Sequence, residues 1–147
     1  MVQNIFAKAK IPDKLPKEMG DLIKELKKSK TKKDCMKKAY LFLSKKYRGY
    51  RIYTYLRFFD LFVSDINNIW AKNGFLHCNT LNYLMRILLI KSELFDEEDI
   101  KLKWTLVWYI SPHQYLNIKI GQNEFINIDL WGKAYGINFG DYAHGFN

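Results

Sequence analysis

The chain has 147 residues, of which 48% are hydrophobic and 27% charged, and its formal net charge is +9. This length and composition predict one domain, able to bury roughly 68–70% of the surface of the extended chain. The densest apolar stretch, residues 81–90, is too short to span a bilayer, and the first ten residues lack the apolar run of a secretory signal. Two cysteines without C-x-x-C spacing fit a reducing compartment and argue against structural zinc. We therefore expect a soluble cytoplasmic protein.

The positive charge is concentrated in the N-terminal part of the chain. Residues 1–60 carry 17 Lys and Arg against 6 Asp and Glu, whereas residues 61–147 carry 7 against 9. Most of the lysines fall on the polar faces of expected helices, which is typical of a solvated surface. The alternative is a contact with nucleic acid or another polyanion. No zinc-finger spacing or RRM-type aromatic signature accompanies it.

The first half of the chain shows the spacing of helices. Residues 1–16, which include Pro12 and Pro16, predict an irregular arm before a short helix from about Lys17 to Lys28. Thr31 and Asp34 resemble a capping box that starts a second helix. The buried stripe of this second helix is expected to consist of Met36, Ala39, Tyr40, Leu43 and Tyr47.

Two further apolar stripes follow. The third helix is expected to bury Phe58, Phe59, Phe62, Ile66, Ile69 and Trp70 and to end at Asn73-Gly74 with a left-handed cap. The fourth begins with the short polar stretch Cys78-Asn79-Thr80. Its buried face is expected to contain Leu81, Leu84, Met85, Leu88 and Leu89.

From Leu102 onward the period changes from helix to strand. The large apolar residues Leu102, Trp104, Leu106 and Trp108 alternate with Lys103, Thr105, Val107 and Tyr109. This alternation predicts a strand that is buried on at least one face and is broken at Ser111-Pro112. Residues 113–120 and 124–130 alternate again around the turn Gly121-Gln122-Asn123. Helices first and an antiparallel sheet second define an α+β domain.

Three residues offer the chemistry of acyl transfer. A thiol attacks as the thiolate, which a helix N-terminus, an imidazole and a carboxylate that orients the imidazole all favour. Cys78 opens a helix, and His113 and Asp129 follow on the two hairpin strands. Cys35 has no such partners and is expected to be structural. His77 could compete as the base, but adjacent residues at a helix start point in different directions.

The register of the hairpin decides whether the imidazole and the carboxylate can meet. With a three-residue loop, or an equivalent bulge, Tyr115 lies opposite Asp129, and His113 and Asp129 share one face of the sheet. With a regular two-residue loop they lie on opposite faces, because a shift of one residue reverses every side chain. The proposed chemistry requires the first geometry.

Three segments together resemble the core of the transglutaminase-like superfamily, a papain-like fold. They are G-F-L-H-C-N-T-L-N-Y-L-M-R-I-L-L, S-P-H-Q-Y-L-N-I-K-I and E-F-I-N-I-D-L-W, within residues 60–131. The resemblance implies one domain over residues 1–147, with a basic helical part (1–59), the core (60–131) and a loop-rich tail (132–147). It departs from the family at Tyr115, where tryptophan is frequent, and at Leu130, where proline is frequent.

The resemblance also implies roles for individual residues. Cys78 would be the nucleophile, His113 the acid and base, and Asp129 the orienting carboxylate, with Tyr115 on the histidine strand. Protein or peptide is the implied substrate, and a thioester on Cys78 would pass to water or to an amine. Tyr53, Tyr55 and Trp70 are candidates for the second oxyanion donor.

Some assignments remain open at this point. Asn82 and Arg86 lie on the Cys78 stripe of the helix, where they could support the site, although Arg86 could instead pair with an acidic residue of 97–99. No nucleotide-binding motif is present, and we expect no cofactor or metal. Two other functions remain as alternatives. One is a catalytically silent peptide-binding member of the same fold, and the other is a basic polyanion-binding module in which the three residues are incidental.

Overall fold

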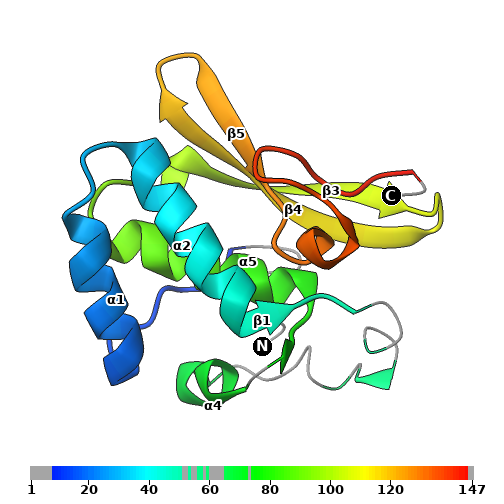
Figure 1. Ribbon diagram of the computed structural model, residues 1–147, viewed down its shortest axis with the longest axis horizontal. Helices are drawn as coiled ribbons and strands as arrows, with labels where there is room; N and C mark the ends of the chain where they lie inside the picture. Colours follow the sequence, from blue (N-terminus) through cyan, green and yellow to red (C-terminus); the bar gives the residue numbers. More distant parts are fainter. Residues whose placement is uncertain are drawn as a thin grey trace.

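The computed structural model describes residues 8–50, 53, 56, 57, 59, 65–72 and 74–145. It combines helices with a three-stranded antiparallel sheet, which confirms the expected α+β class in its coarse form. Figure 1 shows the helices together on one side and the sheet on the other. Among the described residues, no helix has both the length and the apolar character needed to cross a membrane.

The first two helices lie where the sequence predicts them. Helix α1 covers Lys17–Lys27 and α2 covers Lys32–Lys46. Helix α2 begins after Thr31, whose hydroxyl oxygen accepts a hydrogen bond from the backbone N–H of Asp34 at 3.0 Å. The predicted stripe of α2 is buried, and Cys35 is buried with it. The helical period and the polar cap together therefore identified this helix and its core-facing side.

Replacing Thr31 by alanine is expected to lower the free energy of unfolding by about 1 kcal/mol, because the N–H of Asp34 then loses its acceptor in the protein. Urea denaturation of the variant measures the change. Thr31→Ser is the matched control, since a serine hydroxyl can accept the same bond and should retain most of the stability. An equal loss in both variants would mean that the threonine methyl group, rather than the cap, is responsible.

The third predicted helix is much shorter than expected. Helix α4 covers Ile66–Ala71, and Asp65 caps it with an extended backbone (φ −74°, ψ 121°). A single helix from Phe58 to Trp70 is therefore wrong, because Asp65 accepts a hydrogen bond from the N–H of Asn68 and so starts a new helix. Phe59 is exposed rather than buried, and Phe58 and Phe62 lie outside the described residues.

The predicted left-handed residue at the end of this helix is present, but one element later. Helix α4 ends at Ala71, and its cap residue, Lys72, is extended. Gly74 has φ +84° and belongs to the short strand β2, Gly74–Phe75, which pairs in parallel with β1, Tyr47–Arg48. A positive φ favours glycine at position 74 whether a helix or a strand adjoins it.

Helix α5, Cys78–Lys91, lies at the centre of the molecule. Its predicted apolar stripe is buried, but so is every residue from 79 to 89, including Arg86. The helix contacts α1, α2 and the sheet strand β4, so its other faces are covered as well (Figure 1). The helix begins at Cys78, as expected, and its cap residue is His77, whose side chain makes no capping hydrogen bond.

The main sheet has the order β3-β4-β5, with strands Ile100–Val107, Ser111–Gly121 and Glu124–Ile128. The predicted break at Ser111-Pro112 is wrong, because the chain turns earlier, with Val107 opposite Ser111. Trp108 and Tyr109 in this turn have positive φ values of 54° and 59°.

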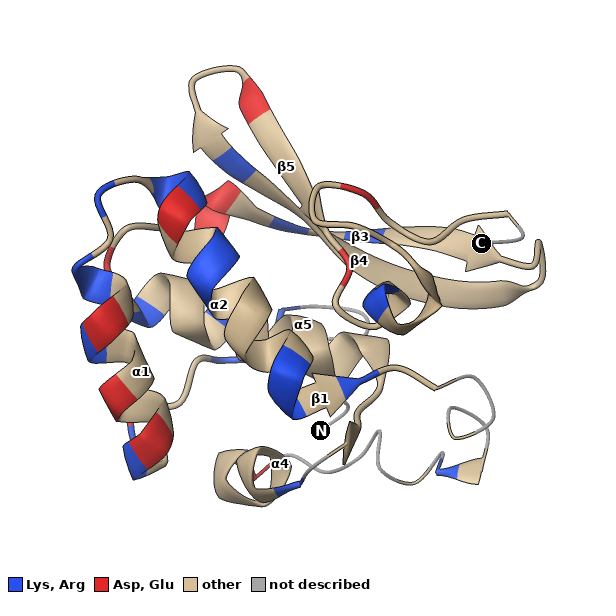
Figure 2. Ribbon diagram, in the orientation of Figure 1, with Lys and Arg blue, Asp and Glu red and all other residues tan. Residues whose placement is uncertain are grey.

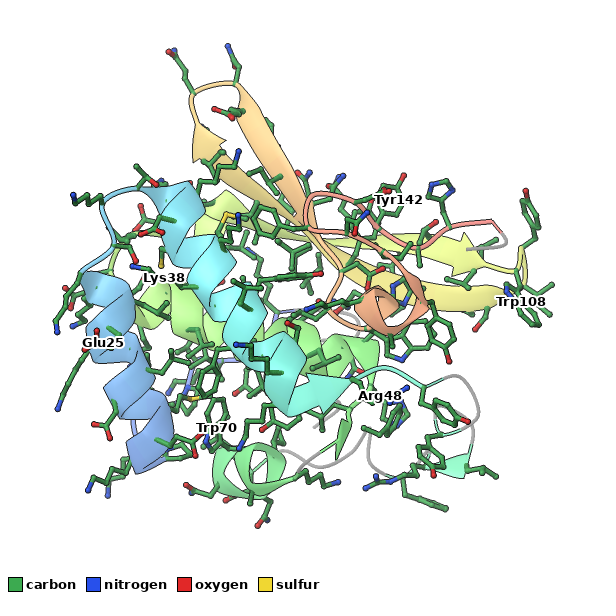
Figure 3. The ribbon with its side chains drawn as sticks, in the orientation of Figure 1. Glu25, Lys38, Arg48, Trp70, Trp108 and Tyr142 are labelled. Carbon is green, nitrogen blue, oxygen red and sulfur yellow. The ribbon has the colours of Figure 1, made fainter. Side chains whose placement is uncertain are left out.

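The predicted buried face of the first strand is also wrong beyond its first residues. Ile100 is buried and Leu102 is partly buried, but Trp104, Leu106 and Trp108 are exposed. The turn end of the β3–β4 hairpin extends past the helices, and Trp108 lies near its tip (Figure 3). The alternation in the sequence continues further than the helical layer that could cover it.

The β4–β5 hairpin contains the bulge that the proposed chemistry requires. Gly121 pairs with Glu124 across a two-residue turn, but the next pair is Lys119 with Phe125, so Ile120 is an extra residue in β4. From there the register runs regularly to Leu116 opposite Ile128. The bulge shifts the pairing by one residue, so that the residues beyond it pair as they would around a three-residue loop. His113 and Asp129 therefore share one face.

Candidate active site

Cys78 is the first residue of α5, and its side chain is partly exposed. Strand β2 and two further residues lead the chain into the helix, and the N–H of Leu81 donates to the carbonyl of His77 at 2.9 Å. The first backbone N–H groups of a helix lack partners within the helix and carry partial positive charge, which favours an anion such as a thiolate.

His113 and Asp129 form a buried pair beneath the C-terminal segment. The Nε2 atom of His113 lies 2.7 Å from Oδ2 of Asp129, and the two residues are only 3% and 2% exposed. The carboxylate also accepts from the N–H of Gly132 through Oδ1 and from the N–H of Ala143 through Oδ2, both at 2.8 Å. Three donors thus fix Asp129, so it can orient the imidazole without moving.

The imidazole connects this carboxylate to the cysteine. Burial alone would lower the pKa of His113, but hydrogen bonds to Asp129 and to Cys78, with the negative charge of both partners, raise it to about 10. Because Nε2 is bonded to Asp129, Nδ1 is the ring nitrogen that remains for the Cys78 sulfur. The three residues predicted from the sequence therefore lie in one chain of contacts.

Two aromatic contacts lie beside these three residues. The Trp131 ring lies 5.1 Å from that of His113, and the Tyr115 ring stacks on Tyr142 with centroids 4.0 Å apart. Tyr142 lies in the C-terminal segment that crosses the sheet (Figure 3). The described part of the tail, residues 132–145, was expected only as loops but provides part of the site.

Gly132 is a site residue that the sequence reasoning missed. A Cβ atom at this position would lie 2.7 Å from Oδ2 of Asp129, so any side chain would displace the carboxylate. The short loop D-L-W-G places its N–H on Asp129. An aspartate followed three residues later by glycine is a signal that could have identified this contact.

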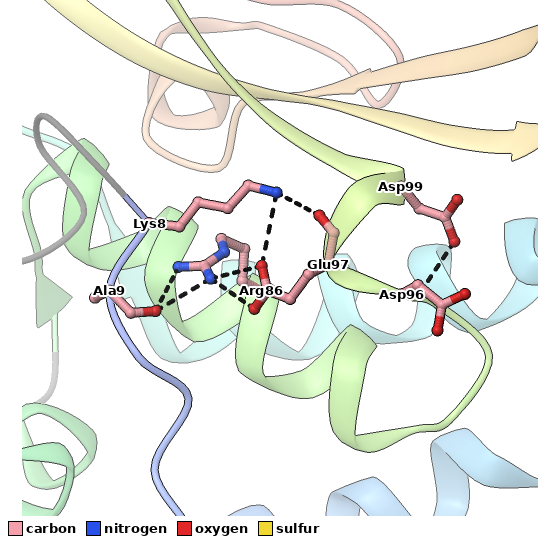
Figure 4. Close-up of polar contacts among 6 residues, drawn as sticks. All are labelled: Lys8, Ala9, Arg86, Asp96, Glu97 and Asp99. Carbon is pink, nitrogen blue, oxygen red and sulfur yellow. Dashed lines mark hydrogen bonds and ion pairs between the residues drawn. The ribbon is translucent and has the colours of Figure 1, made fainter.

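Asn82 supports the site, and Arg86 does not. The amide of Asn82 donates to the backbone carbonyl of Gln114 at 3.0 Å and to its side-chain oxygen at 3.1 Å, which fixes β4 next to His113. Arg86 instead contacts the Glu97 carboxylate at 2.8 and 3.0 Å and the Ala9 carbonyl at 3.1 Å (Figure 4). The sequence prediction that Arg86 pairs with residues 97–99 is confirmed.

The two described candidates for the second oxyanion donor, Trp70 and Tyr53, make other contacts. Trp70 packs against α2, with its ring 5.8 Å from that of Phe42 and Nζ of Lys46 4.9 Å above it (Figure 3). Tyr53 lies over Phe75 in a surface pocket, at 5.8 Å between ring centroids. Tyr55 lies outside the described residues. The backbone N–H of Cys78 is therefore the donor that the helix start itself provides.

The competing histidine and cysteine have other surroundings. His77 Nε2 donates to the carbonyl of Arg57 at 2.8 Å, and its ring packs against Phe75. Cys35 is buried, and burial raises the pKa of its thiol. Both arrangements agree with the structural interpretation of these residues.

Comparison with known proteins adds no relationship to this geometry: no protein-family model, curated protein or solved structure matches the chain. Within the described part of the chain, no group of three or more His, Cys, Asp and Glu residues is arranged to bind a metal ion. The positions of Cys78, His113 and Asp129 are therefore the features that bear on the function of the chain.

Proposed function

We propose that this protein is a cysteine-dependent enzyme that cleaves or transfers acyl groups at amide bonds of proteins or peptides, with a transglutaminase-like, papain-like core. The contact series from Cys78 through His113 to Asp129 carries the proposal. A partly exposed sulfur at a helix N-terminus, beside a buried imidazole, is the arrangement expected of an activated thiol.

The proposed reaction begins with attack of the Cys78 thiolate on an amide carbonyl. A C–S bond forms, the carbonyl oxygen becomes an oxyanion, and the N–H of Cys78 donates to it. As the C–N bond breaks, His113 gives its proton to the departing amine. A thioester remains on Cys78. Water or a second amine attacks its carbonyl carbon while His113 accepts the proton from the nucleophile, and the C–S bond then breaks and returns the Cys78 thiolate.

Asp129 has a distinct task in this reaction. Its carboxylate raises the pKa of His113, and the resulting imidazolium both stabilises the thiolate and supplies the proton for the amine. The N–H groups of Gly132 and Ala143 keep the carboxylate in place during the reaction.

The exposure of the nucleophile favours an enzyme over a silent binding domain. A member of the fold that only binds peptides is expected to have a buried cysteine or a histidine turned away from it. Here the Cys78 side chain is partly exposed and lies close enough to His113 to contribute to the raised pKa of the imidazole.

The surface charges support a polyanion-binding module less than they support an ordinary solvated surface. Figure 2 shows acidic residues among the lysines of α1 and α2. Several of these lysines pair with carboxylates, including Lys28 with Glu25 at 2.9 Å and Lys38 with Asp34 at 3.0 Å. Mixed charges of this kind are typical of a solvated helix surface.

Alkylation with iodoacetamide at neutral pH tests the proposal. Cys78 is expected to react at least about tenfold faster than Cys35, because a thiolate reacts and a buried thiol does not. His113→Ala should remove this preference. His144→Ala is the matched control, because this histidine is exposed and its ring contacts Tyr142. Peptide mapping by mass spectrometry measures both sites, and equal labelling of the two cysteines in the wild type would contradict the proposal.

A further inference from the structure

A pocket of about 520 Å³ opens on the two-stranded ribbon that leads into α5. The described residues that line it are Arg48, Tyr50, Tyr53, Arg57, Gly74 and Phe75. They come from β1, from β2 and from the segment between β1 and α4. Two guanidinium groups and three aromatic rings thus surround a volume that could accommodate an amino-acid side chain.

The guanidinium groups of this pocket are placed against its rings. Arg48 lies 5.9 Å from the centre of the Tyr50 ring, and Arg57 lies 5.7 Å from the centre of the Phe75 ring. Figure 3 shows Arg48 beside aromatic side chains. Stacking on a ring restricts a guanidinium while its edge can still donate hydrogen bonds. The described lining residues thus contribute two positive charges.

The pocket is close to the nucleophile along the chain. Phe75 precedes Cys78 by three residues, a separation of at most about 11 Å for extended backbone. His77, the neighbour of Cys78, packs its ring on Phe75 at 4.8 Å and donates to the carbonyl of Arg57 at 2.8 Å. Arg57 is therefore linked by its own backbone to the residue next to the sulfur.

From this placement we infer that the Arg48–Arg57 pocket binds a carboxylate of the substrate, on the same peptide as the amide that Cys78 attacks. The inference rests on the proposed function and specifies its substrate class: an acidic peptide with its carboxylate within about three residues of the reacting amide. A guanidinium binds a carboxylate through two parallel hydrogen bonds, and in an unmodified peptide the anions are carboxylates. An acidic side chain and a free C-terminus both provide this group.

A matched pair of chloroacetyl peptides tests the inference on the full chain. Chloroacetyl-Gly-Glu-amide and chloroacetyl-Gly-Gln-amide have nearly the same shape and differ in one negative charge. The thiolate forms a C–S bond to the CH₂ group and releases chloride, so the rate reports how often the peptide lies at Cys78. Chloroacetyl-Gly-Gly with a free carboxylate tests a chain terminus as the source of the charge.

The Glu peptide is expected to label Cys78 about tenfold faster than the Gln peptide at low salt, because a charge-assisted pair forms in the pocket. Arg48→Gln and Arg57→Gln should each reduce this ratio toward one, and the circular dichroism spectrum and urea denaturation of each variant show whether it is folded. Arg48→Lys should keep part of the preference. Lys24→Gln, an exposed change on α1, should leave the ratio unaltered.

The outcomes separate the two proposals. Selective labelling of Cys78 at one rate by both peptides, independent of the arginines, would overturn the carboxylate pocket and leave the proposed function standing. Failure of both peptides to prefer Cys78 over Cys35 would count against the proposed function itself. A faster reaction only with the free-carboxylate peptide would support the pocket with a chain terminus as its ligand.

Discussion

Replacing Asp129 by asparagine is expected to lower the rate of amide cleavage by about 10²–10⁴-fold, the usual contribution of a positioned acid or base. The carboxylate raises the pKa of His113 to about 10, so its loss lowers that pKa and weakens the imidazolium beside the Cys78 sulfur. The asparagine also leaves the N–H groups of Gly132 and Ala143 with at most one acceptor oxygen between them. Cleavage of a peptide 4-nitroanilide measures the rate.

The dependence of this rate on pH provides the sharper test. The wild-type rate should fall on the alkaline side only as pH approaches about 10, where His113 loses the proton that the amine needs. In Asp129→Asn this decline should begin at lower pH. A nitrophenyl ester, whose leaving group needs no proton, should be affected less than the anilide by the substitution.

Asp141→Asn is the control for this experiment, because Asp141 is an exposed acid in the same C-terminal segment. Its rate and alkaline limb should match those of the wild type. If Asp129→Asn cleaved the anilide with an unchanged alkaline limb, the carboxylate would not govern the protonation of His113, and the mechanism proposed for the site would be wrong.

Replacing Glu97 by alanine is expected to lower the free energy of unfolding by about 3–5 kcal/mol, the range for a buried charge that loses its partner. The Arg86 side chain is only 1% exposed, and burial lowers the pKa of its guanidinium. Glu97 supplies the opposing charge at 2.8 Å, and Lys8 lies near the same carboxylate (Figure 4). Without Glu97, the buried charge keeps the Ala9 carbonyl as its neutral partner.

Arg86→Met is expected to cost less, about 1–3 kcal/mol, although it removes the more deeply buried residue. The Glu97 side chain is 45% exposed and can be solvated when its partner is removed, so the main loss is the bond to the Ala9 carbonyl. Urea denaturation of both variants and of the double variant gives the comparison, and the double variant should resemble Arg86→Met. A larger loss for Arg86→Met would show that packing of the arginine stem dominates.

Much of the fold could be predicted because its signals are local. Helices α1, α2 and α5 follow from apolar spacing, and Thr31 marks a helix start by its own side chain. The failures have physical reasons. Asp65 interrupts an apolar stripe because a local hydrogen bond starts a new helix there, and Trp104 is exposed because its strand continues past the helices. The alternation of apolar residues in a strand does not show where the helices that cover the sheet end.

The candidate site also has parts that the sequence could predict and parts that it could not. Cys78, His113 and Asp129 could be selected by residue type and order, and the requirement for a bulge followed from parity. The contact between Asp129 and the N–H of Ala143 joins residues fourteen positions apart through a backbone group. Any residue but proline carries that group, so no residue type marks it in the sequence.

The extra residue at Ile120 also determines which length changes the hairpin can tolerate. One residue deleted from the pairing between His113 and Ile120 would turn the imidazole to the opposite side of the sheet from its carboxylate, whereas loss of a pair of residues would preserve the alternation. Diverged versions of this hairpin that keep the same chemistry should therefore vary in length by even steps. Odd changes should occur only where a compensating irregularity is gained or lost.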